Sequence, residues 1–223
     1  MGSMVQFNRT DGQPVPAYEA RATADKAPGV VVIQEWWGLN DQIRGVADRL
    51  AAVGYHAVVP DLYRGKVTTS GDEASHLMSH LDWDVAVQDI GAGAQYLKGT
   101  NPKAGIMGFC TGGALALMAA GAYPDLSAGV VFYGIPPEGK VNYREIKVPL
   151  LLHYATHDGW CNPDAVSALE FELKSGKVNY DLYRYDAQHA FMNDRRPEVY
   201  NEEAANTAWQ RTIAFINQHL HGE

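Results

Sequence analysis

A cysteine stands at the centre of a glycine cluster in the stretch GFCTGG, residues 108–113. The pattern matches the nucleophile turn G-x-S-x-G, with Cys110 in place of the serine. Glycines at positions 108 and 112 would let a strand and a helix pass closely around such a turn. The start of the helix behind Cys110 would favour a thiolate, and the backbone N–H of Thr111 could face a developing oxyanion. The alternative is a buried structural cysteine in a tight strand–helix turn.

An acid and a base follow in later loops of the chain. Asp158 lies in HYATHDGWCNP (residues 153–163), and His189 lies in DAQHAFMND (residues 186–194), each just past an expected strand. The chain order nucleophile, acid, base is the order that the α/β-hydrolase fold imposes. We therefore predict that His189 takes the proton from Cys110 and later protonates the leaving group, while Asp158 orients the imidazole.

Short apolar runs alternate with helical patterns along the chain. The run GVVVIQ, residues 29–34, is typical of a strand buried on both faces. Further strands are expected at residues 55–59, 104–109, 128–133, 149–154 and 180–185. Helices are expected between Asn40 and Gly54 and at residues 83–97, 111–122, 163–174 and 202–220. The alternation predicts an α/β fold with a mostly parallel sheet and ligands at the carboxyl ends of its strands.

The composition limits the class of protein. The 223 residues are 46% hydrophobic, which is enough for one sizeable core, so we expect a single domain over residues 4–223. Residues 1–3 have the character of a cloning remnant. The formal charge of −8 argues against nucleic acid or an anionic membrane surface as a partner. With two cysteines and no apolar leader or spanning segment, we predict a cytoplasmic protein, monomeric or a small homo-oligomer, without a disulfide framework.

Several stretches together resemble one family. They are QEWWGLN (34–40), PDLYRG (60–65), GFCTGG (108–113), FYG (132–134) and EVY (198–200) with the C-terminal helix. The combination resembles the dienelactone hydrolases, or carboxymethylenebutenolidases, from about residue 30 to residue 220. The resemblance implies an α/β-hydrolase fold and a catalytic triad of cysteine, histidine and aspartate, matched here by Cys110, His189 and Asp158. No cofactor or metal is implied.

The resemblance also implies a carboxylate beside the nucleophile, matched by Glu35. In the family this group contacts the resting thiol and helps to deprotonate it when substrate arrives. The backbone N–H of Trp36 would be the second oxyanion donor beside that of Thr111. Without the resemblance, Glu35 is equally well interpreted as a solvated loop carboxylate or a charge at a helix start.

Two departures from the family concern the substrate. Relatives that hydrolyse dienelactone carry an arginine four residues after the histidine and another before the third helix, and here these positions are Asn193 and Gly71. Arg195 and Arg196 could substitute for these arginines from nearby, but the preference of arginine for the surface favours surface ion pairs instead. We therefore expect a less charged ester or lactone as the small-molecule substrate. Residues expected near that substrate are Asn193, Tyr133 and the aromatic residues Trp36, Trp37, Trp83, Trp160 and Phe191, each of which could instead belong to the core.

Other functions stay open at this point. His76 and His80 could share a helix face and bind a metal, but no third ligand is evident. A Cys110–Cys161 disulfide would be a redox switch, which is rare in the cytosol. A broad arylesterase, thioesterase or phosphotriesterase could use the same triad, and a catalytically silent binding module could keep the fold. We predict a cysteine hydrolase that cleaves lactone or carboxylic ester bonds through a thioester.

Overall fold

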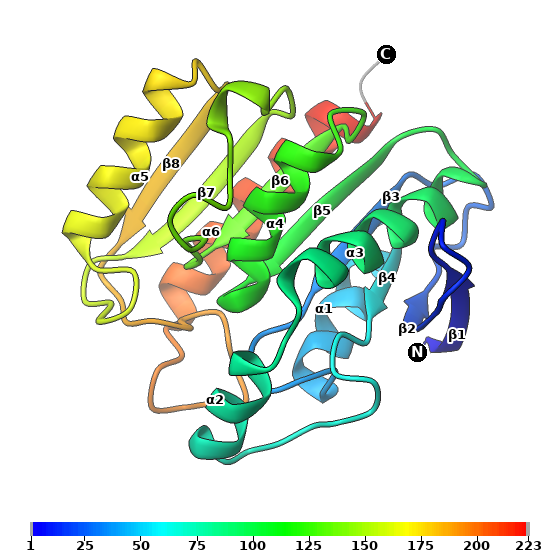
Figure 1. The fold of residues 1–223 in the computed structure, drawn as a ribbon, viewed down its shortest axis with the longest axis horizontal. Helices are drawn as coiled ribbons and strands as arrows, with labels where there is room; N and C mark the ends of the chain where they lie inside the picture. Colours follow the sequence, from blue (N-terminus) through cyan, green and yellow to red (C-terminus); the bar gives the residue numbers. More distant parts are fainter. Residues whose placement is uncertain (1, 222–223) are drawn as a thin grey trace.

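Within the described part of the chain, eight strands form one sheet in the order β1-β2-β4-β3-β5-β6-β7-β8 (Figure 1). The computed structural model describes residues 2–221. The strands are β1 (Ser3–Asn8), β2 (Pro14–Ala20), β3 (Gly29–Ile33), β4 (His56–Pro60), β5 (Ala104–Phe109), β6 (Ala128–Phe132), β7 (Leu150–Ala155) and β8 (Tyr180–Tyr185). Strands β3 to β8 pair in parallel, whereas β1 and β2 are antiparallel additions at one edge. This is the mostly parallel α/β sheet that the sequence predicts.

The described residues form six α-helices, and five of these cover the two faces of the sheet (Figure 1). The six helices are α1 (Asp41–Ala52), α2 (Gly71–Ser79), α3 (Trp83–Lys98), α4 (Thr111–Ala122), α5 (Pro163–Ser175) and α6 (Glu202–Ile216), with a 3-10 turn at Tyr143–Glu145 and a π-turn at Asn217–His221. Helices α3, α4 and α5 cover the near face in Figure 1, and α1 and α6 lie behind the sheet. None of the helices within residues 2–221 combines the length and the hydropathy that a bilayer span requires.

The hydrophobic core consists of two layers because successive strand side chains point to opposite faces. In β3, Val31 and Ile33 join the cluster under α3 and α4, whereas Val30 and Val32 join the cluster under α1 and α6. All five residues of this strand are buried. A strand covered on both faces must be apolar throughout, which explains the uninterrupted run GVVVI.

The expected strands and helices from residue 29 onward are found within a few residues of their predicted bounds. The prediction lacked β1, β2 and α2, and the single helix expected at residues 202–220 ends at Ile216 before the π-turn. Ser3, in the stretch interpreted as a cloning remnant, is the first residue of β1 and pairs with Glu19. Met1 of that stretch and Glu223, the end of the expected domain, lie outside the described residues.

Candidate active site

Three neighbouring regions of the sheet bring the predicted triad residues together. Cys110 follows β5, Asp158 follows β7 and His189 follows β8. These strands are parallel members of one sheet, so their carboxyl ends lie at the same edge. Residues separated by up to 79 positions in the chain thereby meet in one site.

The turn at Cys110 has the strained backbone that a nucleophile turn requires. Its φ of 56° and ψ of −119° are rarely adopted by a residue with a side chain. A Cβ at Gly108 would collide with the backbone of Gly112, and a Cβ at Gly112 would collide with the end of β3. The two glycines are therefore required by close backbone approach, as the sequence predicts.

The three side chains form a hydrogen-bonded chain. The Nε2 atom of His189 lies 3.2 Å from the Cys110 Sγ, and its Nδ1 atom lies 2.7 Å from Asp158 Oδ2. The second oxygen of Asp158 accepts the backbone N–H groups of Trp160 at 2.7 Å and Cys161 at 2.9 Å. A buried carboxylate held in this way fixes the orientation of the imidazole.

The protonation of His189 is shifted by these contacts. Burial alone would lower the pKa of His189, but the hydrogen bonds to Asp158 and Cys110 and the charges of these groups outweigh burial and raise it to about 10. The site therefore stabilises an imidazolium between a carboxylate and a sulfur. That is the charge arrangement a histidine adopts after it has accepted the proton of a nucleophile.

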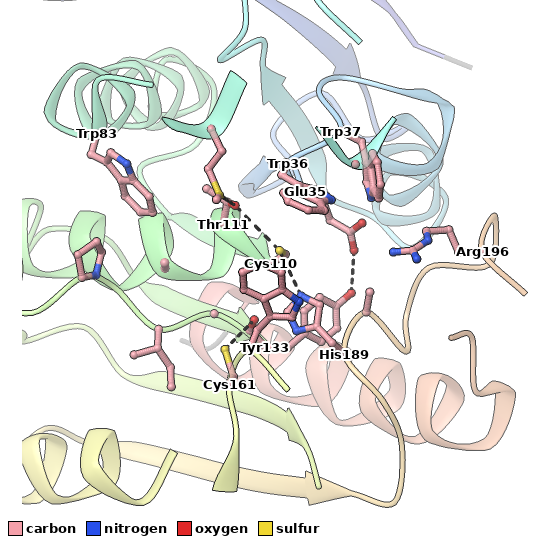
Figure 2. Close-up of a pocket in the computed structure, with 18 residues that line it drawn as sticks. Glu35, Trp36, Trp37, Trp83, Cys110, Thr111, Tyr133, Cys161, His189 and Arg196 are labelled. Atoms are coloured by element: carbon pink, nitrogen blue, oxygen red, sulfur yellow. Dashed lines mark hydrogen bonds between the residues drawn. The ribbon is translucent and has the colours of Figure 1, made fainter. Parts of the chain in front are cut away.

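Glu35 follows β3 and is buried at the same edge of the sheet. Its carboxylate accepts the Tyr133 hydroxyl at 3.1 Å and the Asn193 amide at 2.9 Å, and both Glu35 and Cys110 line the same cavity (Figure 2). Burial raises the pKa of Glu35, and the bonds from Asn193 and Tyr133 and the charge of His189 offset only part of this effect. Asn193 thus contacts Glu35 rather than the open cavity.

A cavity of about 640 Å³ opens beside the Cys110 sulfur (Figure 2). Predicted site residues in its wall are Glu35, Trp36, Trp37, Trp83, Cys110, Thr111, Tyr133, Trp160 and His189. Gly71, at the position where relatives carry an arginine, is also in the wall. Phe191 and Asn193 are buried residues outside the wall, and Phe191 packs edge-on against Tyr133. Thr111 is the first residue of α4, where a backbone N–H has no acceptor within the helix.

Three further side chains line this wall: Arg196, which the sequence offered as an alternative substrate contact, Cys161, which lies three residues past Asp158, and Met78, which no pattern predicted. Arg196 forms the expected ion pair with Glu198 at 2.8 Å, yet it also lines the cavity, with its guanidinium 5.2 Å from the Trp37 ring. Met78 of α2 accepts a hydrogen bond from the Thr111 hydroxyl at 3.2 Å. Met78 comes from a segment with no motif, so only the tertiary structure places it in the wall.

Cys161 is a buried free thiol, as is typical of a structural cysteine, and Cys110 is also free. The Cys161 thiol donates a hydrogen bond to the Tyr133 backbone carbonyl at 3.3 Å. Possible ligand atoms of Asp158, Cys161 and His189 lie within 4.8 Å of one another, which is the closest approach to a metal set within residues 2–221. Burial raises the pKa of the Cys161 thiol, and Asp158 is already bonded to His189, so both groups are poorly prepared to bind a cation.

Similarity to known proteins extends over nearly the whole chain. The model of the dienelactone hydrolase family matches residues 15–220. "Protein usf" of Aquifex pyrophilus is 37% identical, over 99% of this chain and 100% of its own. Carboxymethylenebutenolidase 1 of Cupriavidus pinatubonensis is 30% identical, over 95% of each chain. A Klebsiella pneumoniae crystal structure assigned as a dienelactone hydrolase has a TM-score of 0.89 at 27% identity, covering 98% of each chain.

The matched residues include every strand end of the candidate site. These strand ends carry Glu35, Cys110, Asp158 and His189. The matches also confirm the resemblance found in the sequence and the α/β-hydrolase fold. The chain belongs to the dienelactone hydrolase family, whose members include hydrolases of the carboxymethylenebutenolidase type.

Proposed function

We propose that this protein hydrolyses a carboxylic ester or lactone through a thioester on Cys110. The observation that carries the proposal is the position of His189, 3.2 Å from the Cys110 sulfur and 2.7 Å from the Asp158 carboxylate. A base within hydrogen-bond reach of a nucleophile and oriented by a third group is the signature of nucleophilic catalysis. Membership of the dienelactone hydrolase family supports the same reaction class.

The reaction would proceed in two steps. The Cys110 sulfur attacks the carbonyl carbon, its proton having passed to His189, and a tetrahedral oxyanion forms. Collapse of this intermediate breaks the bond to the alcohol oxygen, which takes the proton from His189, and leaves a thioester. Water then gives a proton to His189 and attacks the thioester carbon; the carbon–sulfur bond breaks, the sulfur takes the proton back from His189, and the acid is released.

The oxyanion would lie between two backbone N–H groups, those of Trp36 and Thr111. Both residues line the cavity beside Cys110 and each follows the end of a strand. Donors fixed in the backbone stabilise the developing charge without reorganising during the reaction. The absence of arginine at positions 71 and 193 supports a substrate less charged than dienelactone.

The test is hydrolysis of a small panel by wild type and Cys110→Ala. The panel contains cis- and trans-dienelactone, a neutral lactone and p-nitrophenyl acetate. Wild type is expected to turn over at least one neutral compound, and Cys110→Ala is expected to lose roughly 10³-fold or more in kcat/KM. Cys161→Ser controls for the second thiol, and mass spectrometry of the quenched enzyme should find the acyl group on Cys110. A folded Cys110→Ala variant that hydrolyses at the wild-type rate would refute the thioester mechanism.

A further inference from the structure

Trp160 has an unusual position for its size. Its side chain borders the cavity, yet 69% of the residue is exposed. Burial of a tryptophan contributes much to stability, so leaving one in water is unfavourable unless another group covers it. Phe171 on α5 is equally exposed at 69%, but it does not line the cavity. Phe171 therefore provides a matched control for exposure without proximity to the site.

The backbone of Trp160 is fixed by the candidate triad. Its N–H donates to Asp158 Oδ1 at 2.7 Å, and the other oxygen of the same carboxylate holds His189. The next N–H, that of Cys161, donates to the same Asp158 oxygen. An exposed ring on a tightly bonded loop keeps its place relative to the nucleophile, so little ordering is needed when a ligand binds.

Trp160 is the end of a row of three rings, which we call the tryptophan row (Trp160, Trp36 and Trp37). The centroids of the Trp160 and Trp36 rings are 5.8 Å apart, and those of Trp36 and Trp37 are 5.2 Å apart, both with interplanar angles of 69°. Figure 2 shows Trp36 and Trp37 next to one another, with Arg196 beyond Trp37. Trp36 and Trp37 are half-buried and Trp160 is exposed, so the three residues keep surface that a further ring could contact.

We propose that the tryptophan row binds a planar aromatic or conjugated ring of the substrate and that Trp160 is the residue that determines this specificity. The proposal rests on the proposed function. Trp36 supplies its backbone N–H to the proposed oxyanion site and its indole to the row. A ring bound on the row is therefore attached within a few bonds of the reacting carbonyl, as in an aryl-substituted acyl group. Ring pairs of this kind contribute beyond simple area burial, which distinguishes a flat ring from an aliphatic one.

The test compares ethyl 3-phenylpropanoate with ethyl 3-cyclohexylpropanoate, which share the leaving group and the distance from ring to carbonyl. Hydrolysis is followed by titration of the released acid. Wild type is expected to prefer the phenyl ester by about 3- to 10-fold in kcat/KM, mainly through KM. Trp160→Ala should reduce this ratio to near one, mainly through a higher KM for the phenyl ester, Trp160→Phe should restore most of it, and Phe171→Ala should leave it unchanged. An unchanged ratio in Trp160→Ala would overturn the proposal.

A binding measurement separates this proposal from the hydrolytic one. Quenching of tryptophan fluorescence by 3-phenylpropanamide and 3-cyclohexylpropanamide is titrated on Cys110→Ala, with and without Trp160→Ala. Phenyl preference in binding without ester turnover in wild type supports the row and rejects the chemistry. If turnover depends on Cys110 but shows no preference for the phenyl ester, the proposed role of the tryptophan row is rejected and the hydrolytic mechanism is not. The same conclusion follows if neither amide binds. If Trp160→Ala changes the molecular mass of the protein in solution but not the phenyl-to-cyclohexyl ratio of kcat/KM, the Trp160 ring belongs to an interface between copies of the chain and the proposal is overturned.

Discussion

The side-chain amide of Asn193 donates a 2.9 Å hydrogen bond to Glu35, although the two residues are 158 positions apart in the chain. Both are buried, and the other carboxylate oxygen of Glu35 accepts the Tyr133 hydroxyl. The carboxylate is thus held by two neutral donors at the back of the cavity. Its orientation depends on these two bonds, because solvent reaches neither side chain to any extent.

Asn193→Leu tests this contact with a side chain of similar size that cannot donate. One oxygen of a buried carboxylate loses its partner, and the Arg195 N–H loses the Asn193 Oδ1 acceptor at 3.1 Å, so the free energy of unfolding is expected to fall by about 1–3 kcal/mol. Urea denaturation monitored by fluorescence measures the change. Asn201→Leu would be a poor control because Asn201 caps α6. Arg195→Leu, in the same loop with an exposed side chain, should change stability by less than about 0.5 kcal/mol. Equal stability of wild type and Asn193→Leu would contradict the assigned role.

Glu35→Gln tests the cost of the buried charge. Glutamine can accept from Asn193 and donate to the Tyr133 oxygen, so both contacts survive. Burial raises the pKa of Glu35 above its ordinary value of 4.5, so the folded protein holds this proton more tightly than the unfolded chain. Wild type therefore loses stability relative to Glu35→Gln as pH rises above 4.5. Between pH 4.5 and pH 8, the free energy of unfolding of Glu35→Gln should increase relative to that of wild type. Glu203→Gln, a change at an exposed residue, should show no such trend. A constant difference across this range would argue against the prediction.

Asp158→Asn tests the shift of His189. The folded-state pKa of His189 is raised from 6.5 to about 10, so the stabilisation is complete below pH 6.5 and disappears as pH rises through 10. The loss of unfolding free energy in Asp158→Asn should thus be larger at pH 6 than at pH 10. Asparagine still accepts the N–H groups of Trp160 and Cys161 through its oxygen, so the loop is preserved. A loss that grows with pH would exclude the assigned ion pair.

Arg196 is the cation in the cavity wall, and its side chain is 34% exposed. A partly solvated charge of this kind attracts an anion only moderately. Arg196→Gln is expected to raise KM several-fold for a substrate with a free carboxylate, such as dienelactone, and to leave neutral esters unaffected. The control is Arg195→Gln, since Arg195 is 71% exposed in its side chain and pairs with Asp194. Equal effects of the two variants on both substrates would show that Arg196 does not act on the substrate.

The sequence predicted those elements whose structure depends on short-range patterns of residue type. The uninterrupted apolar runs of β3 and β5 predict buried parallel strands, and the glycines around Cys110 predict the nucleophile turn. Strand β2 was missed because Pro14 and Pro16 argue against a strand, although both are tolerated in the antiparallel pairing with β1. Helix α2 was not predicted because it has only nine residues, and its short apolar stripe of Ala74, Leu77 and Met78 spans a single turn.

In the site, the strand ends could be predicted but the contacts between them could not. The types and order of Cys110, Asp158 and His189 follow from one motif and the topology. The pairing of Glu35 with Asn193 depends on how two distant loops pack, and no spacing encodes it. The same holds for Arg196. Its surface ion pair was predictable because most arginines are exposed, but its position beside the Trp37 ring was not.

The backbone at Cys110 has a further consequence, which concerns evolution and engineering of the chain. With φ at 56° and ψ at −119°, this position favours glycine over any residue with a Cβ. Cys110→Gly is expected to be more stable than Cys110→Ala by about 1 kcal/mol, although both lack the sulfur. Selection for thermal stability alone would thus drive this position away from cysteine, so any stabilisation campaign on this protein must screen for turnover as well as for Tm.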